Sequence, residues 1–320
     1  MPRRAGFFGV ANPDDAATRA SAQFLLDPLM QNFVDGGWQV EKYLRQDATR
    51  ASLEKMLQDA PPFFFAASHG MGFPNGDPLQ LRHQGALLCQ DWPGPKQWRK
   101  PIPEEFYFAG EHLQKDAKLL GSIGFLFACY GLGTPQLDEF AKQAFKERAQ
   151  IAPHAFSAAL PKTLLGRPEG GALAIVGHVE RAWGHSFLWA GKRGNNQQTE
   201  VFESTLRALM KGVPVGAALE YFDERYAELS SDLSVQLEEL SYGAYVDEYE
   251  MASMWTANND ARGYALLGDP AVRLRFEEGE VRDRSGAWNV AGVTNPELVE
   301  EELVVPVAPE PAYDHASSAP

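Results

Sequence analysis

Two side chains in this sequence have the chemistry of a nucleophile and its base, Cys129 and His69. Each follows a short apolar run, residues 123–128 and residues 63–67, and each is soon followed by a glycine. Runs of this length that stop at turn residues are typical of buried strands in a parallel sheet. Open α/β sheets bind ligands just beyond the carboxyl ends of such strands. The pattern therefore predicts that the thiol and the imidazole meet at one ligand-binding edge.

The alternative for Cys129 is a small buried hydrophobe, which is the usual place of a lone cysteine after an apolar run. Gly131 and Gly133 favour the nucleophile because they leave the site open, and His69 can raise the thiolate fraction. Gly70 then gains a purpose, since its N–H can approach a substrate carbonyl. We expect the N–H groups of Gly70 and Cys129 to form an oxyanion hole, with His69 carrying the thiol proton to the leaving amine.

The group that orients His69 is left open by the sequence. The carboxylate of Asp77 or Asp91 could do so, and a backbone carbonyl would serve equally well. Because no third residue stands out, the prediction is a Cys-His dyad, with Cys129 as nucleophile and His69 as general base.

Composition narrows the class of protein. The chain has 320 residues, 44% of them hydrophobic, and a net charge of -14, which speaks against general nucleic-acid binding. Its acidity would favour basic partners, although a solvated acidic surface is the simpler explanation. Two cysteines, Cys89 and Cys129, give no disulfide framework and suit a reducing compartment, with Cys89 expected in the core. No apolar run reaches the ~18 residues of a membrane span, so a cytoplasmic protein without membrane or nucleic-acid partners is predicted.

The elements that would position the reactive residues follow a β-α-β-α-β order. Strands are predicted at residues 6–11, 38–44 and 63–67, and amphipathic helices at 16–33 and 49–58. The turn at residues 12–15 supplies the N-cap of the first helix, which is expected to bend near Pro28. This order fits right-handed crossovers and a parallel sheet covered by helices on both faces.

Later segments continue the α/β pattern. We predict a short hairpin strand at 85–92, helical pieces within 104–119, a helix-prone charged segment at 137–148, helices at 155–165, 201–211 and 215–229, and strands at 172–177 and 271–276. From residue 277 the acidic, Pro/Ala/Ser-rich sequence cannot bury much, and roughly its last 15 residues are expected to be disordered. The predicted division is one domain over residues 1–276 and an acidic extension over 277–320.

Five stretches, spread from about residue 5 to residue 276, resemble one known family. Residues 68–70 (SHG) and 128–131 (ACYG) resemble the His-Gly and Ala-Cys strand ends of caspase-fold (clan CD) cysteine peptidases, with the nearest likeness to the gingipain-like and CHAT-type branch. Residues 170–177 are similar to the strand after the cysteine, 212–219 to a helix junction, and 267–274 to the closing strand of that fold.

The resemblance implies a three-layer α-β-α sandwich with a mostly parallel sheet of about six strands. It implies a cysteine endopeptidase that forms an acyl-enzyme, often after Arg or Lys. A basic side chain at that position needs an acid, for which Asp91 is the first candidate and Asp77 the second. Trp183 falls where the fold runs beside its substrate, so it would wall a subsite. The alternatives are solvated loop aspartates and a half-buried surface aromatic.

The resemblance also implies a context. Such proteins often act in bacterial defence or signalling, under the control of an activating subunit, and some relatives activate themselves by cleavage after a basic residue. Lys142, Lys146 and Arg148 could mark such a site, although a solvated helix face is the simpler explanation. No cofactor is expected. His178 and His185 lie seven residues apart, which is no metal-ligand spacing, so no metal is expected either.

Two rival functions stay open. A catalytically inactive caspase-like module could bind a regulatory partner protein, although both reactive residues and Gly70 are present. A metal-dependent hydrolase could use the scattered histidines, and it would be sensitive to a chelator rather than to iodoacetamide.

Overall fold

A computed structural model describes residues 3–140, 148–168, 170–191 and 194–274. At its centre is a six-stranded sheet in the order β12-β9-β6-β3-β1-β2. The strands are β1 (Arg4–Gly9), β2 (Gln39–Leu44), β3 (Phe63–Ala67), β6 (Ile123–Phe127), β9 (Ala174–His178) and β12 (Tyr264–Gly268). Four of the five neighbouring pairs are parallel, and only β12 is antiparallel to its neighbour β9. The predicted mostly parallel sheet of about six strands is confirmed.

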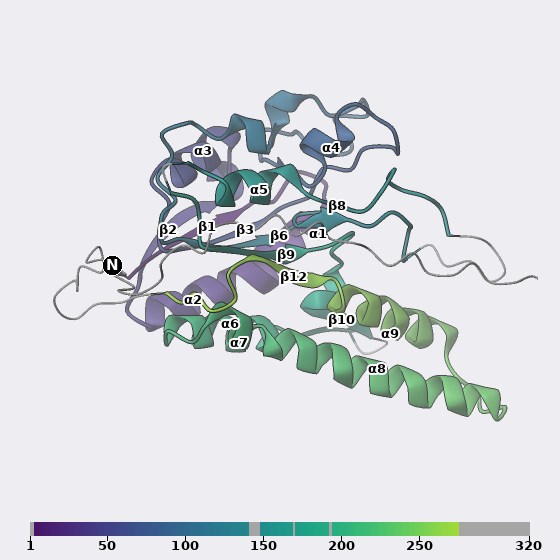
Figure 1. Cartoon of the computed structure of the whole chain (residues 1–320). Helices are drawn as coiled ribbons and strands as arrows, with labels where there is room; N and C mark the ends of the chain where they lie inside the picture. The colour runs from purple at the N-terminus through teal and green to yellow at the C-terminus, as the bar shows by residue number, and fades with distance from the viewer. Residues whose placement is uncertain (1–2, 141–147, 169, 192–193, 275–320) are drawn as a thin grey trace, which may run out of the picture. The chain divides into compact units, whose positions relative to one another are not determined.

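Helices cover both faces of the sheet, which gives the predicted three layers (Figure 1). On one face α3 and α5 pack over Phe8, Phe64 and Leu126, and on the other α2, α6 and α8 pack over Phe7 and Phe65. The helices are α1 (Ala16–Ala20), the π-helix η1 (Ser21–Leu26), α2 (Asp27–Asp35), α3 (Arg50–Gln58), α4 (Gln80–His83), α5 (Ala159–Leu165), α6 (Glu200–Met210), α7 (Val215–Ala218), α8 (Glu220–Ser241) and α9 (Glu248–Ala261). Side chains of successive strand residues point to opposite faces, so the strands contribute to the hydrophobic core on each face of the sheet.

Short elements complete the described part of the chain. The remaining strands pair as β4 (Leu87–Leu88) with β5 (Tyr107–Phe108), β7 (Gly133–Thr134) with β8 (Phe156–Ser157), and β10 (Leu188–Gly191) with β11 (Gly194–Gln197). The 3-10 turns are η2 (Arg45–Asp47), η3 (Glu104–Phe106), η4 (Gly110–His112) and η5 (Gly184–Ser186). No helix in the described ranges has both the length and the apolar character to cross a membrane.

The first helix is continuous from α1 through η1 to α2, as the sequence predicts, and its irregularity lies just before Pro28. Proline donates no backbone hydrogen bond, and its ring clashes with the carbonyl four residues earlier, here that of Phe24. The wider turns of the π-helix at Ser21–Leu26 relieve this crowding. The irregularity expected at Pro28 thus lies one turn earlier, as a π-helix.

The last strand lies elsewhere than predicted. The sheet ends with β12, whereas residues 271–274 follow a turn and residues 275–320 lie outside the described part of the chain. Gly268 has a φ of 116° and is followed by a proline two residues later, which breaks the run. Beyond it, the carbonyls of Pro270 and Val272 accept hydrogen bonds from the start of α7, at 2.9 and 2.8 Å. This segment therefore pairs with a helix N-terminus instead of the sheet.

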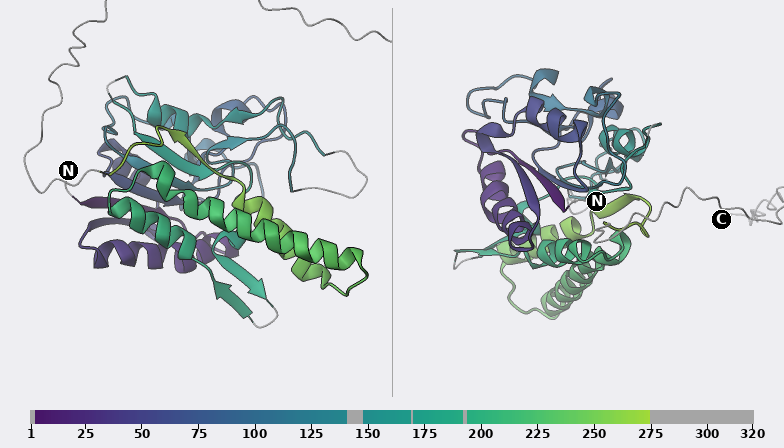
Figure 2. Two further views of the ribbon diagram at one scale, coloured as in Figure 1. Left: turned by 60° about the horizontal axis from the view of Figure 1, so that its bottom comes forward. Right: turned by 90° about the vertical axis from the view of Figure 1, so that its left-hand side faces the viewer.

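The predicted helix at 215–229 is two helices, α7 and α8, and α8 continues to Ser241. Figure 2 shows this long helix beside the β10–β11 hairpin. The predicted boundary at residue 276 and the acidic extension stay predictions, because they fall outside the described residues.

The register of β3 and β6 decides where the reactive residues lie. Ala67 of β3 pairs with Phe127 of β6, and Gly9 of β1 pairs with Ala67. His69 and Cys129 each follow their strand by two residues, so both leave the sheet at the same level and from adjacent strands.

Candidate active site

Cys129 stands on a tight turn directly after β6. Its neighbour Tyr130 has a φ of 56°, a left-handed conformation that is uncommon for a residue with a side chain. The N–H of Tyr130 donates to the carbonyl of Glu180 at 2.5 Å. Glu180 is itself left-handed, with a φ of 74°. Such a conformation costs about 1–3 kcal/mol per residue and persists where the surroundings impose it, often at functional sites. The strained turn therefore holds the cysteine in one position.

Two glycines allow neighbouring segments to reach this turn. A Cβ added at Gly70 would lie 1.7 Å from the carbonyl oxygen of Cys129, and one at Gly85 would lie 2.1 Å from that of Tyr130. Both distances are far inside van der Waals contact. The glycine that follows His69 in the sequence is thus required by the close approach of two backbones.

Within the described ranges the N–H group of Gly70 has no hydrogen-bond partner and that of Cys129 contacts only its own sulfur, although neighbouring groups are paired. The N–H of Met71, for example, donates to the carbonyl of Ala86 at 2.8 Å. Gly70 and Cys129 are both partly exposed. Unpaired donors beside a nucleophile can stabilise the negative oxygen of a tetrahedral intermediate. The oxyanion role predicted for these two groups stays a prediction, and the geometry is compatible with it.

The carboxylate that contacts His69 is Asp15, in the loop between β1 and α1. Its Oδ2 lies 2.5 Å from Nε2 of His69. Its Oδ1 accepts the N–H groups of Ala17 and Thr18, at 2.9 and 3.3 Å, and so forms the N-cap of α1. Asp15 is 8% exposed and the imidazole is 38% exposed. Because Nε2 faces this carboxylate, Nδ1 is the ring atom that can accept a proton.

The hypothesis that Asp77 or Asp91 orients His69 is wrong. Asp77 accepts the N–H of Leu79 at 2.8 Å within its own loop, and exposed Asp91 accepts the N–H of Arg50 at 2.7 Å at the start of α3. From the sequence, the turn at residues 12–15 is predicted only to cap the first helix. A signal was present, because the loop after β1 meets the same sheet edge as the ends of β3 and β6.

The ionisation of the site follows from its burial and its pairs. Burial raises the pKa of the Cys129 thiol, and the negative charge of Asp260 adds to this. The resting side chain is therefore a protonated thiol that needs a base. For Asp15, burial raises the pKa, but the hydrogen bond to His69 and its charge, with the N–H groups of α1, outweigh burial and lower the pKa below its usual value. This carboxylate is ionised at neutral pH.

Cys129 and His69 open into one cavity of about 290 Å³. Cys129 Sγ lies 3.6 Å from the carbonyl oxygen of Ala182, on the loop after β9. The cavity is lined by the first helix (Ala17, Thr18, Ala20, Ser21), by the two strand ends (Ser68, His69, Phe127, Ala128, Cys129), and by residues after β9 (Arg181, Ala182, Trp183, Gly184, Phe187, Leu188). A thiol, an imidazole and space for a ligand thus share one concave surface, and Asp77 and Asp91 are not part of it.

Trp183, the predicted subsite wall, lines this cavity and is 39% exposed. The backbone N–H of Trp183 donates to Asp260 Oδ1 at 2.8 Å. Asp260 is buried at the end of α9, accepts the hydroxyl of Ser186, and its backbone carbonyl lies 2.8 Å from His178 Nε2. This buried cluster holds the loop after β9 in place. No local pattern indicates this cluster, because Asp260 lies more than seventy residues from His178, Trp183 and Ser186.

Other reactive side chains have structural surroundings. Cys89 is completely buried, as predicted, and burial raises the pKa of its thiol. His83, Glu104 and Glu111 place ligand atoms within 4.8 Å of one another, a spacing that would allow a metal. Both ring nitrogens of His83 are engaged, however, with Glu111 at 2.9 Å and Tyr107 at 2.7 Å. We therefore interpret this cluster as a hydrogen-bond network. Lys142 and Lys146 lie outside the described residues.

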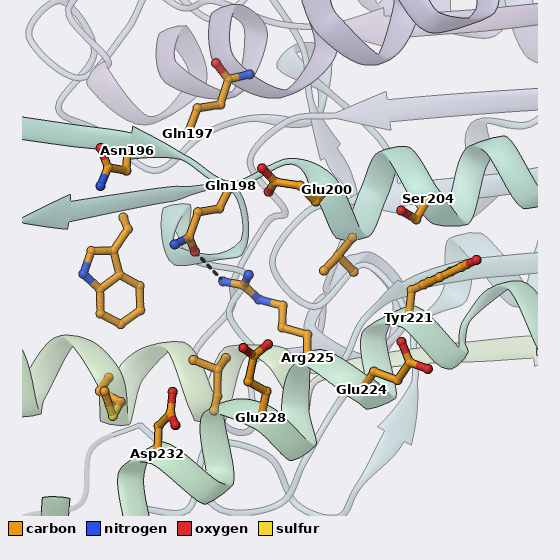
Figure 3. A pocket seen from close by; sticks show the side chains of 14 residues that line it. Asn196, Gln197, Gln198, Glu200, Ser204, Tyr221, Glu224, Arg225, Glu228 and Asp232 are labelled. Atoms are coloured by element: carbon orange, nitrogen blue, oxygen red, sulfur yellow. Dashed lines mark hydrogen bonds between the residues drawn. The ribbon is translucent and has the colours of Figure 1, made fainter.

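A second, larger cavity of about 680 Å³ lies between the β10–β11 hairpin, the start of α6, and α8 (Figure 3). It carries the carboxylates of Glu200, Glu224, Glu228 and Asp232. The guanidinium of Arg225 donates to Gln198 at 3.3 Å across it. We refer to it below as the acidic groove.

Comparison with known proteins yields only distant structural likeness. No family model and no curated protein matches the chain. Two solved structures are each 11% identical to this chain in sequence, with a TM-score of 0.42. One is gingipain R, an Arg-specific cysteine proteinase, and the other is a complex of the pro- and mature domains of RgpB from Porphyromonas gingivalis. Each covers 86% of this chain, and a third protease structure is 12% identical with a TM-score of 0.38 and covers 84%. The chain spans about half the length of these structures, 48–49%. At these values the likeness says nothing of what this chain cleaves or binds.

Proposed function

We propose that the protein is a cysteine peptidase in which Cys129 is the nucleophile and His69 the general base. The observation that carries this proposal is that both side chains open into one cavity, and that no other residue in the described ranges accepts a hydrogen bond from the N–H groups of Gly70 and Cys129. Asp15 is assigned as the positioning residue of His69. This replaces the predicted dyad with a Cys-His-Asp arrangement.

The proposed reaction has two stages. His69 Nδ1 takes the thiol proton, the sulfur attacks the substrate carbonyl carbon, and a C–S bond forms while the oxygen becomes negative between the two N–H groups. His69 then gives its proton to the amide nitrogen, the C–N bond breaks, and the amine leaves a thioester. Water, deprotonated by His69, attacks the thioester carbon, and the acid product leaves as the sulfur regains its proton.

The base is essential in this scheme because the thiol does not ionise by itself. Burial holds the pKa of Cys129 above its usual value. Asp15, ionised beside Nε2, keeps the proton of the neutral ring on that atom and stabilises the imidazolium that forms.

The expectations about substrate, control and biological context differ in what supports them. A protein or peptide substrate follows from the chemistry. Control by an activating subunit and a place in a bacterial defence or signalling cascade rest on the family resemblance alone. A preference for Arg or Lys would need a carboxylate in the lining of the cavity, and the lining supplies none. Buried Asp260, whose charge acts on Cys129, lies outside the lining and already accepts the backbone N–H of Trp183 and the hydroxyl of Ser186.

The test is peptide hydrolysis by the wild type, Cys129→Ala and Cys89→Ala. Fluorogenic peptides varied at the residue before the cleaved bond are offered to all three, with and without iodoacetamide. We expect turnover by the wild type and Cys89→Ala, and a loss on the order of 10⁶ in kcat for Cys129→Ala, as when a catalytic nucleophile is removed. Equal turnover by wild type and Cys129→Ala would overturn the proposal. No turnover and no alkylation of Cys129 would favour the inactive-module alternative.

A further inference from the structure

The cavity beside Cys129 has an apolar lining. Phe127 and Phe187 are 7% and 2% exposed, and their rings pack edge to face with centroids 5.6 Å apart. Trp183 and Leu188 add further apolar surface, and the first helix contributes no side chain larger than that of Thr18. Since the residue attacked by the cysteine must place its side chain near the sulfur, this lining faces that side chain.

The hydroxyl groups in the lining are already used within the protein. Thr18 Oγ1 accepts the N–H of Asn12 at 3.1 Å, and Ser21 Oγ donates to the carbonyl of Thr18 at 3.0 Å. Ser68 Oγ donates to the carbonyl of Leu88. Each hydroxyl thus already holds one hydrogen bond within the protein, so a polar substrate side chain would find fewer partners here than it has in water.

The lining also has no carboxylate for a cationic side chain. All residues of the lining lie in the described ranges. Besides His69, the only charged side chain among them is that of Arg181. Arg181 is paired with Glu180 at 2.9 Å and with Asp138, and it lies over the Phe140 ring at 5.2 Å. A buried cation without a counter-charge is strongly disfavoured. An anionic side chain would have to displace two carboxylates.

The size of the cavity suits a large side chain. An apolar cavity of about 150 Å³ in another protein is enough to hold benzene. At about 290 Å³, the cavity here has room for a long aliphatic or an aromatic group.

We infer that this cavity is the primary specificity site and that it takes a large apolar side chain (Leu, Met or Phe) on the residue whose carbonyl Cys129 attacks. The inference rests on the peptidase function proposed above, and it differs from the preference for Arg or Lys that the family resemblance implies. It names peptides with a large apolar residue before the cleaved bond as the substrate class.

Matched fluorogenic peptides that differ only at this residue test the inference on the wild-type protein. The series is Leu, Met, Phe, Ala, Arg and Asp, and the readout is kcat/KM. Burial of a large apolar side chain and the lack of a partner for charge predict roughly 10-fold or greater preference for Leu, Met or Phe over Ala, and about 100-fold over Arg and Asp. Turnover of the Arg or Asp peptide at a rate equal to that of the Leu peptide would overturn the inference and leave the peptidase function intact.

Peptidyl chloromethyl ketones with the same residues give a second measurement that needs no turnover. The thiolate of Cys129 displaces chloride and forms a thioether, whose appearance is followed by intact mass. Faster labelling by the Leu reagent than by the Arg reagent supports the inference, and the reverse order overturns it. If labelling of Cys129 is absent or independent of the peptide, and no peptide is hydrolysed, then the proposed function itself fails.

A carboxylate introduced into the lining should change the preference. Ala20 lines the cavity and is partly exposed, so Ala20→Asp can present a carboxylate there. Gln23, on the same helix, is exposed and outside the lining, so Gln23→Asp adds the same charge elsewhere. We expect Ala20→Asp to raise the Arg-to-Leu ratio of kcat/KM by about 10-fold or more, and Gln23→Asp to leave it within about twofold. Equal ratios in the two variants, both folded by their melting curves, would overturn the inference.

Discussion

The two cavities of this protein differ in what supports them. The acidic groove is the larger, about 680 Å³ against about 290 Å³, and most of its charged side chains are solvent-exposed groups on α6 and α8. The cavity beside Cys129 is built on adjacent strand ends, backed by Gly70 and Gly85, and it borders a carboxylate-imidazole pair. Its reactive groups are held by backbone contacts and buried hydrogen bonds, whereas those of the groove are free to move in water.

The difference shows that size alone is a poor guide to chemistry. Exposed carboxylates on a helix are screened by water and change little in reactivity. The Cys129 thiol is a different case, because burial raises its pKa and it shares a cavity with an imidazole that can act as its base. Five measurements test this contrast.

Asp15→Asn should give the largest effect. Asparagine still caps α1, so the fold should survive, but it no longer favours the Nε2–H tautomer of His69. We expect kcat to fall by about 10²–10⁴ while KM changes little. Asp14→Asn is the matched control, because Asp14 is exposed and pairs only with Lys96 among the contacts described.

The same variant also tests the pH dependence of stability. The folded pKa of Asp15 is lowered, so its contribution is present above the unfolded pKa, near 4, and is lost as pH falls through the folded value. The stability difference between wild type and Asp15→Asn, about 1–2 kcal/mol at pH 7, should shrink towards pH 3 in urea titrations. A kcat near that of the wild type would remove this residue from the site.

Gly70→Ala should come next. Its Cβ would lie 1.7 Å from the carbonyl oxygen of Cys129, so the two backbones must separate and the N–H groups of residues 70 and 129 move apart. Loss of one oxyanion donor lowers kcat by about 10²–10³, and we expect at least this loss. Gly72→Ala is the control, because its Cβ would meet only the Tyr130 ring at an ordinary 3.5 Å. If both variants keep full activity, the close approach has no catalytic purpose.

The pH dependence of alkylation gives an intermediate effect. Because burial raises the pKa of Cys129, the thiolate fraction at neutral pH is small and grows about tenfold per pH unit below the pKa. The rate of reaction with iodoacetamide, measured by intact mass, should therefore rise steadily from pH 7 to pH 9. Cys129→Ala should show only the slow background of buried Cys89. A rate that is constant over this range would mean a resting thiolate-imidazolium pair instead.

The sequence predicted the parts of this site that depend on local pattern. The run at Phe63–Ala67 is apolar throughout and ends at a turn, so both the strand and the place of His69 follow from it. The same holds for Ile123–Phe127 and Cys129. Parallel strands in register bring such ends together whatever the rest of the chain does.

Contacts between distant segments depend on the strand order and follow from no local pattern. Asp15 reaches His69 across 54 residues, and nothing local distinguishes it from Asp77 or Asp91 as a partner. The last strand was misplaced because residues 264–268 and 271–276 are both rich in apolar residues. The break at Gly268 and the pairing of Val272 with α7 decided between them. The apolar lining beside Cys129 likewise depends on three segments that meet only in the fold.

The smallest effect is expected from the acidic groove. Glu224, Glu228 and Asp232 follow one another at intervals of four along α8, so like charges are adjacent on one face of the helix. Each such pair destabilises a helix by about 0.2–0.5 kcal/mol. The triple variant to Gln, Gln and Asn should therefore raise the free energy of unfolding by roughly 0.4–1 kcal/mol, with a smaller gain in high salt. Its kcat/KM should stay within about twofold of the wild type. A loss of activity comparable to that of Asp15→Asn would show that the groove takes part in the reaction, and the contrast between the two cavities would no longer hold.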